Sequence, residues 1–246
     1  MPSPVKAAAT AHGIAVTDRV ADVLDAGVEL GVVVAFGKLI KAHVLDVVPM
    51  VNLHFSLLPR WRGAAPVERA VLAGDAETGV CLMALDPGLD TGPVYDCVRT
   101  PIGADESVDE LRQRLVELGT PLLVEHLTRG LGTPTPQQGE PTYATKIDPA
   151  ELELDLSQPA DVVHRTVRLG RAWTTFRGTR LQVLAARPVS EGPDVGTIDG
   201  LVLGCGGGTG LELLMVKPEG KGAQDAKAWR NGARPAPGEP IGRVSA

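Results

Sequence analysis

The chain carries the segment NLHFSLLPRWRGAAP at residues 52–66 and the segment DPGLDTG at residues 86–92. Asn52 and His54 lie two positions apart inside an apolar run, residues 50–55. Because successive side chains of a β-strand point to opposite faces, a strand over this run places both polar side chains on one face. The segment therefore predicts a strand that presents an amide and an imidazole together, followed by a turn that carries two arginines around a tryptophan.

These two side chains, together with the carboxylate of Asp90, suit the transfer of an acyl or formyl group to an amine. The oxygen of such a group becomes an oxyanion, which Asn52 and a protonated His54 could hold by hydrogen bonds. Asp90 would keep His54 protonated or relay the proton that the amine loses. Each residue alone also fits a structural role, since Asp-x-Gly is commonly a simple turn. The combination of the three favours the catalytic interpretation.

Composition indicates a globular protein with an aliphatic core. The 246 residues are 43% hydrophobic and only 3% aromatic, which suffices for one large domain or two modest ones. No apolar run has the length of a membrane span and no export segment opens the chain, so we expect a cytoplasmic protein without a membrane partner. Cys81, Cys97 and Cys205 are isolated, which predicts buried reduced thiols and no metal site.

The charge is distributed unevenly along the chain. Residues 148–246 contain 12 acidic and 12 basic side chains, so the whole formal charge of −6 lies in residues 1–147. The tail from residue 217 to residue 243 carries six bases against three acids. A balanced half is typical of any solvated surface, so this distribution permits nucleic-acid binding without indicating it.

The first half has the pattern of an α/β domain. The apolar run at residues 31–37, bounded by glycines, predicts a strand buried on both faces. A long helix is expected after the capping box Ser107-Val108-Asp109-Glu110, with Gly119 breaking or kinking it. The other expected elements are helices at residues 5–11, 16–24 and 67–72 and strands at residues 50–55, 80–85 and 94–98.

The second half has a different pattern. Residues 130–141 are rich in Gly, Pro, Thr and Gln, which is typical of an interdomain linker. After a helix expected at residues 160–169, short β-type runs favour a small barrel. These runs lie at residues 180–185, 196–198, 201–203 and 211–216. The glycine-rich residues 204–210 lead from one strand into another, so they predict a hairpin loop and not a phosphate loop.

The segment SLLPRWRGAAP, preceded by Asn-x-His and followed by GLDTG, closely resembles the methionyl-tRNA formyltransferases within the folate-dependent formyltransferase family. AGDAETGV at residues 73–80 and KPEGK at residues 217–221 extend the resemblance along nearly the whole chain. It implies a Rossmann-like α/β catalytic domain over residues 1–130, a linker over 131–147 and an OB-like β-barrel, tRNA-binding domain over 148–246.

The resemblance also implies an activity. The formyl group of 10-formyltetrahydrofolate would pass to the methionine amine of initiator Met-tRNA, giving formyl-Met-tRNA for translation initiation, in a monomer that needs no metal. One alternative is another folate-dependent formyl transfer or hydrolysis that acts on a small amine. A second alternative is an inactive, truncated remnant that binds tRNA or folate.

The family's catalytic trio falls on Asn52, His54 and Asp90. The resemblance places the folate donor against Val34, Ala35, Phe36, Gly37, Ser56, Leu57, Leu58, Pro59, Met83, Gly88 and Leu89. Arg60 and Arg62 are candidates to hold the tRNA acceptor end or to position the active-site loop, and arginine suits phosphate because its fork of donors is bidentate. Lys217, Lys221 and Arg230 are candidate phosphate contacts, with solvated surface as the equal alternative.

One departure from the family lies at the start of the chain. The relatives begin with a strand that ends in a Gly-Thr-Pro turn, then a helix and a basic loop, before they reach the sequence that here begins Met1-Pro2-Ser3-Pro4. By this resemblance we expect the first strand of the Rossmann-like sheet, part of the folate pocket wall and the family's tRNA-contacting loop to be absent. A start codon assigned at an internal Met and a true truncation would both produce this. A sheet that lacks this strand exposes unpaired backbone, so we expect low stability and weak or no activity if the chain begins here.

Overall fold

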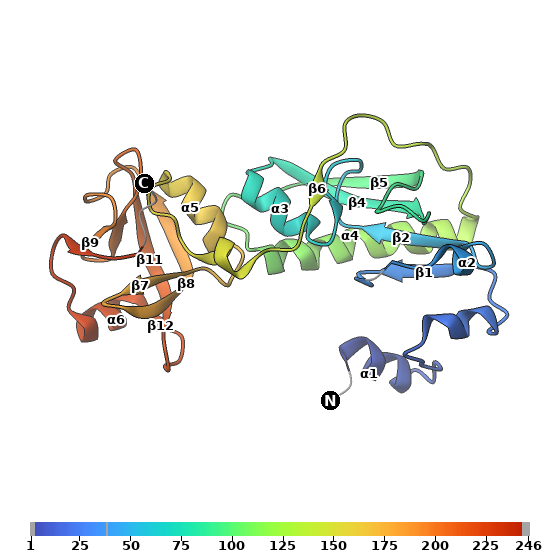
Figure 1. Ribbon diagram of the computed structural model, residues 1–246, viewed down its shortest axis with the longest axis horizontal. Helices are drawn as coiled ribbons and strands as arrows, with labels where there is room; N and C mark the ends of the chain where they lie inside the picture. The colour runs from blue at the N-terminus through green and yellow to red at the C-terminus, as the bar shows by residue number, and fades with distance from the viewer. Residues whose placement is uncertain (1–2, 38, 243–246) are drawn as a thin grey trace.

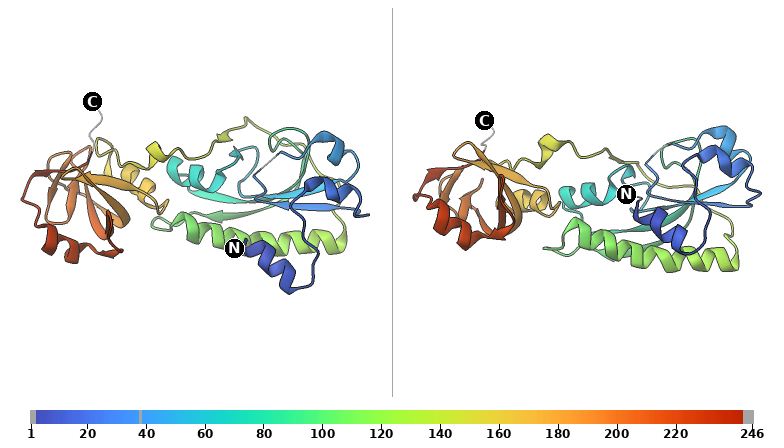
Figure 2. Two further views of the ribbon diagram at one scale, coloured as in Figure 1. Left: turned by 60° about the horizontal axis from the view of Figure 1, so that its bottom comes forward. Right: turned by 90° about the horizontal axis from the view of Figure 1, so that it is seen from below.

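The structure is a computed structural model that describes residues 3–37 and 39–242. It consists of an N-terminal α/β domain and a C-terminal β-barrel domain, which lie at opposite ends of an elongated molecule (Figures 1 and 2). This arrangement confirms the predicted fold class. None of the helices in the described part of the chain has the length and hydropathy of a membrane span.

A mixed four-stranded sheet in the order β1-β2-β4-β5 forms the centre of the N-terminal domain. Strand β1 (Gly31–Val34) runs parallel to β2 (Met50–His54), and β2 runs antiparallel to β4 (Glu77–Ala84). Strand β5 (Val94–Pro101) then pairs antiparallel with β4. The three strands predicted at residues 50–55, 80–85 and 94–98 are thus confirmed, and all five residues of β2 are buried.

Helix α4 (Val108–Arg129) covers one face of this sheet, and its N-terminus is closed by the predicted capping box of Ser107 and Glu110. The predicted break at Gly119 is wrong, because the helix continues to Arg129. A Cβ added at Gly119 would lie 3.0 Å from Val80 Cγ1, so the glycine serves close packing of the helix against the sheet. The core between helix and sheet is made by Val51, Leu53, Val80, Leu82, Leu111 and Leu115.

Strand β1 differs from its prediction. Val32 and Val34 are 43% and 46% exposed, so the strand is not buried on both faces. The reason is its position, because within the described residues β1 pairs with β2 alone and forms the edge of the sheet. The helix predicted at residues 16–24 is also reduced, to the 3₁₀ turn η1 (Val20–Leu24), while the predicted first helix is present as α1 (Pro4–Ala11).

The cysteines require a correction. Cys81 and Cys97 form a disulfide, so the prediction of three free thiols was wrong for this pair. The two residues face each other across β4 and β5, and their Cα atoms lie 4.1 Å apart. Cys205 is a buried free thiol as predicted, and burial raises its pKa to about 11.

The first part of the predicted linker lies along the N-terminal domain. Thr135 exchanges two backbone hydrogen bonds of 2.8 Å with Val94, and β6 (Tyr143–Ala144) pairs in parallel with β3 (Arg62–Gly63). We call residues 135–144 the strap. It crosses above the strands of the N-terminal domain in Figure 1 and leads toward α3 (Pro66–Ala73) and the second domain.

The C-terminal domain is a nearly closed antiparallel barrel in the order β13-β9-β10-β11-β8-β7. Phe176 and Ile241 form a bridge that joins the two ends of this order. Residues 204–210 connect two paired strands, which confirms the hairpin prediction. The elements are η2 (Pro149–Leu152), α5 (Ala160–Val167), β7 (Trp173–Phe176), β8 (Thr179–Val189), β9 (Thr197–Asp199), β10 (Val202–Gly204), β11 (Gly210–Pro218), β12 (Gln224–Asp225), α6 (Ala226–Ala233) and β13 (Glu239–Pro240).

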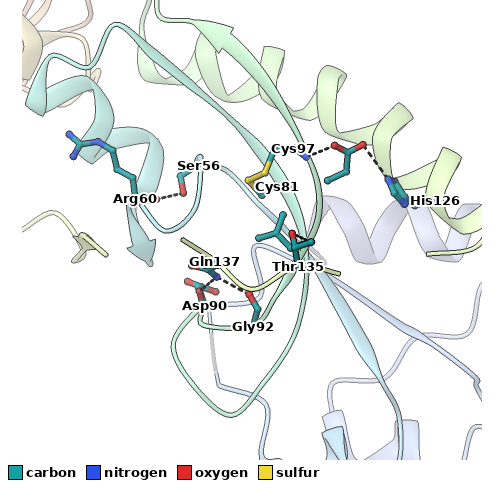
Figure 3. Close-up of a disulfide and its surroundings, with 11 residues drawn as sticks. Ser56, Arg60, Cys81, Asp90, Gly92, Cys97, His126, Thr135 and Gln137 are labelled. Atoms are coloured by element: carbon teal, nitrogen blue, oxygen red, sulfur yellow. Dashed lines mark hydrogen bonds and ion pairs between the residues drawn. A yellow bond between two sulfur atoms is a disulfide. The ribbon is translucent and has the colours of Figure 1, made fainter. Parts of the chain in front are cut away.

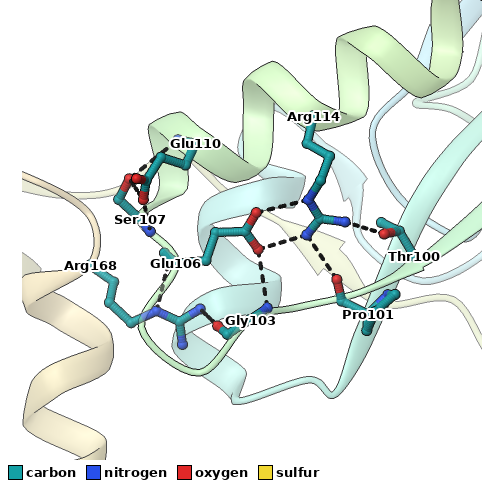
Figure 4. A network of polar contacts seen from close by, with 8 residues as sticks. All are labelled: Thr100, Pro101, Gly103, Glu106, Ser107, Glu110, Arg114 and Arg168. Atoms are coloured by element: carbon teal, nitrogen blue, oxygen red, sulfur yellow. Dashed lines mark hydrogen bonds and ion pairs between the residues drawn. The ribbon is translucent and has the colours of Figure 1, made fainter.

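Polar contacts join the two domains at the start of α4 (Figure 4). The Arg168 guanidinium donates to the backbone oxygens of Gly103 and Glu106, each at 2.7 Å. The Glu106 carboxylate accepts two hydrogen bonds from the Arg114 guanidinium, at 2.9 and 2.7 Å. Val108 N–H in turn donates to the Arg168 carbonyl at 2.9 Å. Backbone and side chains therefore hold the second domain against the first.

Candidate active site

A cavity of about 280 Å³ opens where β2 ends, between β1 and the loops that follow β2 and β4. Asn52 and His54 both line it, and they are 8% and 5% exposed. Alternation along β2 places the two side chains on the same face, as predicted. The remaining lining is largely apolar, with Val33, Ala35, Phe36, Leu39, Ile40, Leu45, Phe55 and Leu85 beside Gly63, Asp86 and Asp90.

Two contacts orient the His54 ring. Its Nε2 lies 2.8 Å from the Trp61 carbonyl oxygen, which can only accept, so this nitrogen carries a proton. Its Nδ1 lies 3.6 Å from Asp90 Oδ2. Burial lowers the pKa of His54, and this effect outweighs the opposing influences of Asp90 and of the Trp61 carbonyl. Burial thus favours the neutral imidazole, and in that form the contact with Trp61 places the proton on Nε2 and leaves Nδ1, beside Asp90, without one.

Asp90 lies at the tip of the loop between β4 and β5, with a backbone φ of 51°. Its Oδ2 accepts a hydrogen bond from Gly63 N–H at 2.8 Å, which fixes the carboxylate near His54. Asp86 shapes the start of the loop, because its Oδ1 accepts from Gly88 N–H at 3.0 Å and from Thr91 Oγ1 at 2.6 Å.

The turn after β2 is held by its own polar contacts. Arg60 donates from Nε and Nη2 to Asp75 at 2.8 and 2.6 Å, and Trp61 Nε1 donates to the same carboxylate at 2.8 Å. Ser56 Oγ donates to the Arg60 carbonyl at 2.5 Å. Burial raises the pKa of Asp75, but the hydrogen bonds from Arg60 and Trp61 outweigh it and hold this pKa below its ordinary value.

Arg62 also makes an internal contact. Its guanidinium donates to the side-chain oxygen of Gln137. The amide nitrogen of Gln137 in turn donates to the loop that carries Asp90, as Figure 3 shows. The contacts of Arg60 and Arg62 match the positioning role that the sequence left open for them beside tRNA binding.

The cavity contains some of the residues predicted to contact folate. Ala35, Phe36, Gly37, Gly88 and Leu89 line it. Strand alternation turns Val33 toward the cavity in place of the predicted Val34. Residues 56–59 form the turn behind it, where Ser56 is fully buried. The predicted residues outside the lining are Val34, Ser56, Leu57, Leu58, Pro59 and Met83.

The residues predicted to contact tRNA lie in both domains. Lys217, Lys221 and Arg230 are exposed on the C-terminal domain, at β11, the turn that follows it and α6. Arg230 and Arg234 line a surface hollow of about 520 Å³ next to Asp199. Arg60 and Arg62 lie on the N-terminal domain, in the segment that follows β2.

Sequence reasoning missed three groups that contact the trio or its loop. They are the Gly63 N–H, the Trp61 carbonyl and the Gln137 side chain. The first two are backbone groups, whose direction the residue type does not reveal. Gln137 lies 47 positions from Asp90 in a stretch with the composition of a linker, so no local pattern marks it.

Both halves of the chain match families of known proteins. A family described as formyl transferase matches residues 6–127, and the formyl transferase C-terminal domain matches residues 146–234. The methionyl-tRNA formyltransferase of Jannaschia sp. (strain CCS1) is 42% identical over 96% of this chain and 84% of its own length. That of Halorhodospira halophila is 43% identical over 98% of this chain and 85% of its own length.

Solved structures share the fold. The methionyl-tRNA formyltransferase from Clostridium thermocellum superposes with a TM-score of 0.62 at 18% identity, over 85% of this chain and 86% of its own. HypX from Aquifex aeolicus in complex with tetrahydrofolic acid superposes with a TM-score of 0.65 at 18% identity, over 82% of this chain and 38% of its own.

Proposed function

This chain belongs to the formyl transferase family, and from that premise we propose that it transfers the formyl group of 10-formyltetrahydrofolate to the methionine amine of initiator Met-tRNA. The observation that carries the proposal is the convergence of Asn52, His54 and Asp90 on one cavity. The identity of 42% to a curated methionyl-tRNA formyltransferase over 96% of the chain supports the choice of acceptor.

The cavity suits the ring end of a folate. Its apolar walls at Phe36, Ile40, Leu45 and Leu85 would contact a flat heterocycle, and the loop at residues 85–90 would meet its edge. Its volume of about 280 Å³ lies just below the range of about 300 to 1,000 Å³ that is usual for small-molecule sites, so it would take part of the donor. When bound, the donor supplies an activated formyl group on nitrogen.

The trio divides the chemistry among its members. As the amine attacks the formyl carbon, negative charge develops on the formyl oxygen, and the Asn52 amide donates a hydrogen bond to it. The neutral Nδ1 of His54 takes the proton that the amine loses, because Nε2 already donates to Trp61. Asp90, 3.6 Å from Nδ1, stabilises the imidazolium that results. The bond from the formyl carbon to the donor nitrogen then breaks, and His54 returns a proton to that nitrogen.

The acceptor tRNA would contact both domains. Lys217, Lys221 and Arg230 would neutralise phosphates from the C-terminal domain, which is basic relative to the rest of the chain. Arg60 and Arg62 would face the acceptor end while they hold the turn after β2. One chain supplies all three catalytic side chains, so we infer that the working unit is a monomer, acting in the cytoplasm where charged tRNA is made.

A formylation assay tests the proposal directly. Purified protein and 10-formyltetrahydrofolate are offered initiator Met-tRNA, elongator Met-tRNA or small amines such as free methionine and an amino sugar. We expect formyl-Met-tRNA from the initiator substrate and little product from the others. Product only with the small amines would show that the acceptor is a small amine and not initiator Met-tRNA. Folate binding without any turnover would favour the inactive remnant.

A further inference from the structure

The side chain of Gln137 uses all of its hydrogen-bonding capacity. Its Oε1 accepts from Arg62 Nε and Nη2 at 3.0 and 2.7 Å, and its Nε2 donates to the carbonyls of Asp90 and Gly92, each at 2.8 Å. A carboxamide offers two acceptor lone pairs and two donors, so this amide is fully satisfied and its orientation is determined. Figure 3 shows the amide between Asp90 and Gly92.

The strap fixes Gln137 from both sides. Before it, Thr135 exchanges backbone hydrogen bonds with Val94, the first residue of β5. After it, Thr142 accepts a bond of 2.9 Å from Trp61 N–H on its Oγ1 and one of 2.9 Å from Arg62 N–H on its carbonyl. Gln137 therefore projects from a segment that is hydrogen-bonded to both walls of the active site.

The loop that Gln137 contacts has an unusual backbone. Asp90 adopts a φ of 51°, in the left-handed region that residues other than Gly adopt uncommonly and that Asp and Asn tolerate best. Gly92 lies so close to β4 that an added Cβ would be 1.9 Å from the Ala84 carbonyl oxygen. The loop thus lies directly against the sheet at Gly92, and Gln137 holds the carbonyls of Asp90 and Gly92 by hydrogen bonds. The position of the Asp90 carboxylate relative to His54 follows from this backbone.

We propose that Gln137 is a positioning residue for formyl transfer, which holds the Asp90 loop in its catalytic geometry, and that Arg62 acts through it by fixing the amide. This inference rests on the proposed function. Gln137 does not line the cavity, so it acts on Asp90 and does not touch the reacting atoms. Glutamate at this position would keep the acceptor for Arg62 but would place oxygen against two carbonyls, so glutamine is required by its donors.

The test compares Q137M, which removes all four hydrogen bonds at nearly equal volume and charge, with Q138M at the exposed neighbouring position. We expect Q137M to lower kcat by about 10- to 100-fold, since small displacements of catalytic groups cost rates of this order. The KM for the folate donor should change by less than about 3-fold, because the cavity lining is intact. Q138M should keep both constants. A kcat for Q137M equal to that of Q138M would overturn the proposal.

A double variant tests whether Arg62 acts through Gln137 or independently of it. If Arg62 acts through Gln137, R62M should lower kcat to a similar degree, and R62M/Q137M should be no slower than the slower single variant. Multiplied effects would show that Arg62 acts independently, which would overturn its part in the proposal. Unfolding temperatures are measured beside the rates. A kcat for Q137E equal to that of the wild-type chain would contradict the requirement for donors at this position.

A measurement without substrate keeps this inference separate from the proposed function. The NMR titration of the His54 ring reports how close the Asp90 carboxylate lies, because this carboxylate raises the histidine pKa. In Q137M the midpoint should move to lower pH, while Q138M should match the wild-type chain. An unchanged midpoint in Q137M would refute the positioning role even if no formylation of any acceptor were found.

Discussion

His54 is placed to change its charge during a reaction. At 5% exposure the neutral ring is favoured, and the hydrogen bond to the Trp61 carbonyl leaves Nδ1 free to accept a proton. Once Nδ1 is protonated, Asp90 at 3.6 Å supplies the opposite charge. Burial thus lowers the pKa of His54 and Asp90 raises it, and the effect of burial is the larger.

Replacement of this ring should remove most of the activity. We expect H54A to lower kcat by about 10²- to 10⁴-fold, the usual contribution of a positioned general base. Since the neutral form is the active one in the proposed mechanism, the wild-type rate should rise with pH up to the lowered pKa of His54, which lies below 6.5, and level off above it. The pH–rate profile of H54A should lack this rise. A near-normal rate in H54A would remove His54 from the mechanism.

At the scale of single residues, the sequence predicts those site residues that lie within one strand or one motif. Asn52 and His54 share a face through strand alternation alone, and Asp90 follows from the GLDTG motif. The neutral state of His54 depends on burial by the folded loops, which no local pattern encodes. Gln137 depends on the path of the strap, so it too becomes visible only in three dimensions.

At the scale of elements, α4 is stabilised at its N-terminus by a reciprocal pair of contacts. Ser107 Oγ accepts from Glu110 N–H at 3.2 Å, and Glu110 Oε2 accepts from Ser107 N–H at 2.9 Å. The hydrogen bonds from Ser107 hold the pKa of Glu110 below its ordinary value. This cap also lies beside the contacts of Glu106 and Arg168 that join the two domains.

Loss of the cap should therefore lower the free energy of unfolding by a measurable amount. We expect S107A to lower the free energy of unfolding by about 1 kcal/mol, the usual cost of removing an N-cap side chain. Urea unfolding followed by circular dichroism provides the measurement. S190A, at an exposed position outside the helices and strands, is the control and should stay within about 0.5 kcal/mol of the wild type. Equal midpoints for the two variants would contradict a stabilising cap.

Element predictions succeeded where a pattern reports directly on burial. The apolar runs of β2, β4 and β5 and the capping box of α4 correspond to observed elements. The prediction of a break at Gly119 was wrong because this glycine allows close approach to Val80, a tertiary contact that overrides its low helix propensity. The strap was read as linker because its composition lacks a core pattern, although backbone hydrogen bonds hold it in place.

At the scale of the whole molecule, the domain contact contains a buried histidine. His164 on α5 is 7% exposed and lies 4.0 Å from Asp105, near Arg168. Burial lowers the pKa of His164 and Arg168 lowers it further, which together outweigh Asp105. His54 has a lowered pKa as well. Both rings therefore resist protonation in the folded chain more than in the unfolded chain.

The sign of the resulting pH dependence follows from linkage. Below the ordinary value of 6.5 the unfolded chain binds more protons than the folded chain, so the free energy of unfolding should fall as pH decreases from 6.5 toward the lowered values. Urea midpoints at pH 7.5 and 5.5 measure this change. H164Q should reduce the difference between the two midpoints, and a chain whose stability increases on acidification over this interval would contradict the assignment.

The edge of the sheet is the remaining feature at this scale. In the described part of the chain β1 has β2 as its single neighbour, and Val32 on β1 is 43% exposed with Phe36 beyond it at 40%. Unpaired backbone beside exposed apolar side chains offers a template for pairing with another chain. Although we infer that the catalytic unit is a monomer, we expect self-association through this edge that increases with concentration in sedimentation-velocity runs. V32K should suppress this association, because an edge lysine cannot be buried between paired strands, whereas V195K, at a similarly exposed valine of the second domain, should leave it unchanged. Equal association of both variants would place the contact elsewhere on the molecule.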